Sequence, residues 1–84
     1  MADFSLVKSQ DGEIRGIWLA NPENADQIGY LTALALRIGN EEGSQAPFEA
    51  VLAKDYRVVP NTYDEAGGCF VMFGSTLAPG EEAG

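Results

Sequence analysis

The chain opens with an alternation of side chains that is typical of a β-strand. Phe4 and Leu6 share one side of this segment, and a short polar stretch follows. That stretch contains Asp11-Gly12, a dipeptide that favours a tight hairpin turn because both residues tolerate positive φ. Apolar residues return after the turn, with Gly16 indicating a bulge. We therefore predict a β-hairpin over residues 3–19.

After Pro22 the spacing of apolar residues changes to three and four, which is typical of a helix with one buried face. Asn24 is a good N-cap and Gly39 a common stop signal, so the pattern predicts a helix over residues 25–38. The residues expected on its buried face are Ile28, Leu31, Leu34, Ala35 and Ile38. Alternate residues from Ile28 to Ile38 would also line one face of a long strand, so that interpretation stays open.

The second half of the chain is less regular. Residues 40–47 are expected to form a loop, whereas 48–54 fit a helix and a strand about equally. Tyr56–Val59 favours a strand because of its β-branched and aromatic residues, and Pro60 ends it. A polar loop over 61–68 precedes Cys69–Phe73, a continuous apolar run that is typical of a central strand buried on both sides.

These elements together predict an α+β fold. An N-terminal hairpin and one helix (about 25–38) would pack on an antiparallel sheet of three or four strands, forming one domain over residues 1–78 with a flexible acidic tail at 79–84. The alternative is an all-β meander, in which 28–38 is a strand. In the α+β fold the helix is expected to pack against Leu6, Ile14, Trp18, Val58, Phe70 and Met72.

Charge narrows the range of partners. The 84 residues include 13 acidic and only five basic ones, which gives a net charge of -8. Phosphate contacts need clustered lysine and arginine, so direct binding of nucleic acid is not expected, and neither is binding to an anionic membrane. A protein with a basic surface is the expected partner. Acidity also keeps proteins soluble, and that simpler explanation stays open.

Candidate chemistry is sparse. The chain has no histidine, the usual base beside a serine or cysteine nucleophile, and no clustered metal ligands. Cys69 is the single cysteine and lies in an apolar run, which predicts a buried, unreactive thiol without an internal disulfide. We therefore expect no cofactor, no metal and no enzymatic activity. The first residues lack the features of a secretory signal, so a cytoplasmic location is expected.

The acidic residues concentrate where predicted elements end. If the loops converge in space, they would form a negative face, and we select them as candidate partner-binding residues together with Tyr63, the aromatic residue expected to be most exposed. The candidates are Asp11, Glu13, Glu41, Glu42, Tyr63, Asp64 and Glu65. Loops are also where charged residues ordinarily lie, so simple solvation is the competing interpretation.

These observations favour a non-enzymatic binding protein that inhibits or modulates a larger cytoplasmic partner by occupying a basic surface of the kind that binds nucleic acid. Small virus-encoded inhibitors of host defence nucleases or polymerases have this general character, although no shared motif supports the comparison. The alternative is a structural or assembly subunit of a homo-oligomer, joined through Phe73, Leu77 or an open sheet edge. A small enzyme using Glu41, Glu42, Asp64 and Glu65 is a third hypothesis.

Overall fold

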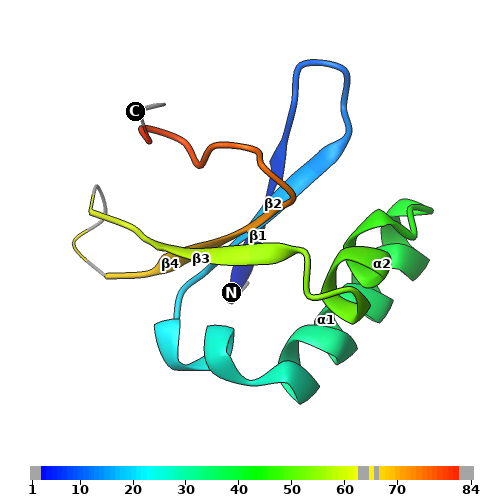
Figure 1. Ribbon diagram of the computed structural model, residues 1–84, viewed down its shortest axis with the longest axis horizontal. Helices are drawn as coiled ribbons and strands as arrows, with labels where there is room; N and C mark the ends of the chain where they lie inside the picture. The colour runs from blue at the N-terminus through cyan, green and yellow to red at the C-terminus, as the bar shows by residue number, and fades with distance from the viewer. Residues whose placement is uncertain (1–2, 63–64, 66, 82–84) are drawn as a thin grey trace.

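The computed structural model describes residues 3–62, 65 and 67–81. It confirms the α+β prediction: a four-stranded antiparallel sheet carries both helices on one face (Figure 1). The sheet order is β1-β2-β4-β3, so β1 and β3 form its edges. The elements are β1 (Phe4–Lys8), β2 (Ile14–Leu19), the short 3-10 helix η1 (Pro22–Asp26), α1 (Ile28–Glu42), α2 (Ala46–Leu52), β3 (Tyr56–Pro60) and β4 (Cys69–Phe73).

The predicted hairpin is present, and it contains a β-bulge. Val7 is opposite Gly16, but Lys8 is opposite Ile14, so β2 has one extra residue, Arg15. An extra residue reverses the alternation of side chains beyond it. Ile14 and Ile17 therefore both face the helices, although they are three positions apart. The bulge lies next to the glycine that the sequence singled out, Gly16.

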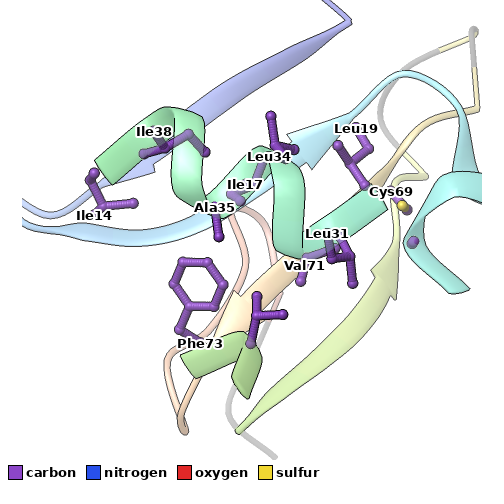
Figure 2. Packing of buried hydrophobic residues seen from close by; sticks show 12 residues of the cluster. Ile14, Ile17, Leu19, Leu31, Leu34, Ala35, Ile38, Cys69, Val71 and Phe73 are labelled. Atoms are coloured by element: carbon purple, nitrogen blue, oxygen red, sulfur yellow. The ribbon is translucent and has the colours of Figure 1, made fainter. Parts of the chain in front are cut away.

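The core lies between the sheet and α1. Along this layer α1 runs from Leu31, near Leu19 and Cys69, to Ile38, near Ile14 (Figure 2). The last turn of α1 is therefore at the same end of the sheet as the hairpin turn. The core cluster consists of Ile14, Ile17, Leu19, Ala25, Leu31, Leu34, Ala35, Ile38, Val51, Cys69, Val71 and Phe73.

Several predicted core residues lie elsewhere. Ile28 and Val58 are 49% and 41% exposed, because Ile28 begins α1 and Val58 is on an edge strand. Trp18, Phe70 and Met72 were expected to face the helix. By register they point to the outer face of the sheet, the one opposite the helices, because Trp18 pairs with Phe70 and neighbours the inward-facing pair of Ile17 and Val71.

The outer face is closely packed around two glycines and is crossed by residues 74–81 (Figure 1). A Cβ at Gly68 would lie 2.6 Å from the indole of Trp18, so the absence of a side chain allows the ring to pack there. A Cβ at Gly16 would lie 2.5 Å from the sulfur of Met72. The indole N–H of Trp18 is buried and has no hydrogen-bond partner among the described residues.

The helix boundaries differ from the prediction. Asn21, rather than Asn24, supplies a capping oxygen, which accepts from the backbone N–H of Glu23 in η1 at 3.1 Å. The long helix begins only at Ile28 and continues to Glu42. It ends at Gly43, whose φ of 72° is left-handed.

Residues 40–47 were expected to be a loop, but only 43–45 connect the helices: 40–42 belong to α1 and 46–47 to α2. Gly39 is buried inside α1, where a Cβ would lie 3.1 Å from the carbonyl oxygen of Ser44. This glycine permits a close approach of the chain instead of ending the helix. α2 starts at Ala46, with Pro47 in its first turn, where the fixed φ of proline suits a helix and its missing N–H costs no hydrogen bond.

The buried and exposed faces of α1 predict a large and a small loss of stability for substitutions of two leucines. Leu31 is 1% exposed, so Leu31→Ala should reduce the free energy of unfolding by about 2–5 kcal/mol through lost burial and a residual cavity. Leu36 is 47% exposed, and Leu36→Ala should change it by no more than about 0.5 kcal/mol. Urea denaturation measures both, and equal losses would contradict this orientation of α1.

Candidate functional site

The hairpin turn and the end of α1 meet at one end of the molecule. Lys8 Nζ lies 2.8 Å from Glu42 Oε1, joining residues 34 positions apart in the chain. This contact follows from the direction of α1 over the sheet, which brings its last turn beside the start of β2 (Figure 2). Four predicted residues gather at this hairpin–helix end: Asp11, Glu13, Glu41 and Glu42.

Glu65, the remaining candidate among the described residues, does not join them. Glu65 lies in the loop between β3 and β4, and the register places this loop beside Leu19, because Cys69 pairs with both Leu19 and Pro60. β2 separates that loop from the hairpin turn by about 17 Å, the length of five residue steps in a strand. Tyr63 and Asp64 lie outside the described residues. Of the five candidates that the structure describes, four therefore share the hairpin–helix end and Glu65 lies apart from them.

Asp11 shapes the hairpin turn. Its carboxylate accepts hydrogen bonds from the Ser9 hydroxyl and, at 3.2 Å, from the backbone N–H of Glu13. The hydrogen bond from Ser9, with help from that of Glu13, lowers the pKa of Asp11. Gly12 adopts the positive φ of 86° that the turn requires. Asp11 is therefore ionised and held in place at neutral pH.

Each of the four predicted carboxylates at the hairpin–helix end has a cationic partner. Arg15 lies 2.9 Å from Glu13 and 4.0 Å from Asp11, while Arg37 lies 3.1 Å from Glu41. With the pair of Lys8 and Glu42, these ion pairs comprise four carboxylates and three cations. The strongly negative face expected from the loops is therefore largely offset there by the chain's own cations.

A hollow opens between the hairpin turn, the end of α1 and the start of α2. Its volume is about 490 Å³, which is within the range of small-ligand sites. The polar side chains that line it come from different elements: Glu13 and Arg15 from the hairpin, Glu42 from α1, and Ser44 from the connection to α2. The full lining is Gly12, Glu13, Ile14, Arg15, Glu42, Ser44, Ala46, Phe73 and Gly74.

Six carboxylates of the described residues have no ion pair. The backbone of Asp3 pairs with Ala20 after β2, and η1 and the β3–β4 loop lie at this same end. Four of these acids are therefore at the end opposite the hairpin turn: Asp3, Glu23, Asp26 and Glu65. Asp55 and Glu49 are also unpaired, as is Lys54 among the described cations.

Arg57 fastens the C-terminal segment to the outer face. Its guanidinium donates to both carboxylate oxygens of Glu81 and, at 2.9 Å, to the carbonyl oxygen of Thr76. The Thr76 hydroxyl lies 2.6 Å from the carbonyl oxygen of Phe73 and 3.2 Å from that of Arg15, in the bulge. The predicted acidic tail therefore contains a residue, Glu81, that is bound to the sheet.

Sequence reasoning missed the cations of this site. The ion pairs of Arg15 could have been predicted, because Arg15 follows Asp11 and Glu13 at alternate positions around a predicted turn. The ion pair of Lys8 and Glu42 could not have been predicted, since their contact depends on how α1 lies over the hairpin.

Comparisons with known proteins assign no family to this chain. A search found no matching family model, no matching curated protein and no matching solved structure. Within the described residues, no three or more acidic or cysteine side chains are grouped so as to hold a metal ion. None of the helices described here combines the length and the apolar character that crossing a bilayer requires.

The ion pair of Arg57 and Glu81 predicts a particular dependence of stability on pH. The hydrogen bonds from Arg57 lower the pKa of Glu81 from its ordinary 4.5 to about 2. A carboxyl group whose pKa is lower in the folded state stabilises the fold above its ordinary pKa. That contribution is lost as the pH falls from about 4.5 to about 2.

Glu81→Gln should therefore lose stability at neutral pH and show a flatter decline between those two values than the unmodified chain. Thermal unfolding at a series of pH values tests this. Leu77→Ala, in the same segment, is the control and should keep the original pH dependence. An unchanged pH dependence in Glu81→Gln would show that the ion pair contributes nothing to stability.

Proposed function

We propose that this chain is a small acidic protein without catalytic activity that binds a basic surface on a larger protein partner through its hairpin–helix end. One observation carries the proposal: four carboxylates border this end, and the only cations that neutralise them belong to exposed ion pairs at the surface. Carboxylates arranged in this way are available to a partner's lysine and arginine side chains.

The internal ion pairs leave this surface usable because they are weak. The side chains that form them are 35% to 63% exposed. Exposed ion pairs typically contribute only about 0–1 kcal/mol, so a partner's cation can replace an internal one at small cost. The net charge of -8 supports the proposal further, because it accelerates encounter with a basic surface.

Surfaces that bind nucleic acid are basic grooves that accept a row of phosphates. The proposed mechanism is occupation of such a groove, with carboxylates in the positions of phosphates. Bound in this way, the protein would exclude nucleic acid from its partner and so inhibit or modulate it.

A second candidate function is that of an assembly subunit. Leu52 is 62% exposed and Val58, on the edge strand β3, is 41% exposed, so apolar surface is available for contact with another copy. Phe73, which was expected to serve this purpose, is only 8% exposed and belongs to the core. Light scattering separates the two functions: a monomer in isolation favours the first, and a defined oligomer favours the second.

The main experiment tests competition for a basic surface. The immobilised protein captures partners at low ionic strength, and complexes are then washed with rising salt or with a single-stranded oligonucleotide. We expect affinity to fall at least about tenfold between 50 and 500 mM salt, since screening weakens exposed charge contacts. The oligonucleotide should release the partner. Retention under both conditions would contradict the proposal.

Two sets of substitutions, each removing four negative charges, locate the binding surface. The first set neutralises the hairpin–helix end and should abolish capture: Asp11→Asn, Glu13→Gln, Glu41→Gln and Glu42→Gln. The second neutralises the opposite end and should leave most of the affinity intact: Asp3→Asn, Glu23→Gln, Asp26→Asn and Glu65→Gln. Equal losses would show that net charge alone is responsible, and a larger loss from the second set would assign binding to the opposite end.

A further inference from the structure

We propose that the hollow at the hairpin–helix end receives an arginine side chain of the partner, and that Lys8 is the internal cation it displaces. This inference rests on the proposed function and specifies the chemistry of its binding surface. It is carried by a combination of features in one place: a cavity of suitable size, an apolar floor and a carboxylate held by a single lysine.

The floor of the hollow suits the stem of a long basic side chain. Ile14 and Phe73 line it and are each 8% exposed, and Ala46 adds a small side chain at its edge. The methylene groups of arginine bury favourably against such residues while the charged end stays near water. A planar guanidinium also stacks on an aromatic ring, which a compact ammonium does less well.

Glu42 is the carboxylate best placed to bind the incoming cation. It lines the hollow and is 35% exposed, and its contact with Lys8 is a single one at 2.8 Å. An arginine can offer two parallel N–H groups to the same carboxylate, a stronger and more directional arrangement than a lysine provides. Replacement of Lys8 by a partner's arginine therefore improves the bonding of Glu42.

The chain itself contains two examples of this chemistry. Arg57 binds both oxygens of Glu81 on the outer face. Arg37 pairs with Glu41 while its guanidinium carbon lies 5.3 Å from the centre of the Phe4 ring. In the hollow, Glu13 already has an arginine partner in Arg15, so a partner's arginine would improve the bonding of Glu42 and not that of Glu13.

Binding of an N-acetylated hexa-arginine amide peptide, followed by calorimetry at low salt, tests the inference. Lys8→Gln leaves Glu42 without its internal partner and should raise the affinity about fivefold, the upper range for an exposed ion pair. Lys54→Gln makes the same change in net charge, but Lys54 has no ion pair among the described residues and does not line the hollow. It should change the affinity by less than about twofold.

A variant without any charge change tests the cavity itself. Ala46→Phe should fill the hollow, and we expect it to lower the affinity at least about tenfold while thermal unfolding shows that the fold is retained. Hexa-lysine should bind the unmodified chain more weakly than hexa-arginine.

The outcomes separate the two proposals. One outcome is salt-dependent binding that Lys8→Gln and Lys54→Gln change equally and Ala46→Phe does not change. It overturns the arginine site and leaves the proposed function standing. Absence of any binding to the basic peptide overturns both. Loss of binding in Ala46→Phe together with the difference between the two lysine variants supports the site.

Discussion

The extra residue in β2 determines most of this structure. In a regular strand Ile14 and Ile17 would face opposite sides, and one of them would leave the core. With Arg15 inserted, both pack beneath α1, and the strand still pairs with β1 on one side and β4 on the other. The bulge also places the Arg15 side chain beside Glu13 and leaves its carbonyl oxygen near the Thr76 hydroxyl. The turn, the hollow and the C-terminal segment are thus all arranged around one irregular position.

Much of the fold was readable from the sequence because local signals agreed with one another. Asp11-Gly12 marked the turn, and the apolar run from Cys69 to Phe73 marked a strand inside the sheet. The helix boundaries could not be predicted. A glycine can end a helix or allow another segment to approach closely, and the sequence does not distinguish these two roles for Gly39. The exposure of Val58 could not be predicted either, because it depends on strand order. A side chain on an edge strand such as β3 is covered less than one on a central strand.

The candidate site was predicted in part. The position of acidic residues after each element was visible, and the pairing of Asp11 and Glu13 with Arg15 follows from their alternate spacing around the turn. The meeting of Lys8 with Glu42 was hidden because it depends on the direction of a helix across a sheet. Charge counting along a sequence therefore identified a surface rich in carboxylates, whereas the degree to which they are neutralised is a property of tertiary structure.

The buried thiol gives this protein an internal probe of its own opening. Cys69 is 2% exposed, and burial, with a smaller effect from the charge of Asp26, raises the pKa of its thiol. Its side chain lies in the core cluster with Ala25 of η1 and Leu31 of α1, so an alkylating reagent can reach the sulfur only when this end of the core opens. Because the chain contains no other cysteine, the rate of covalent labelling reports how often the core opens at the end of the sheet where β4 begins, without any introduced label.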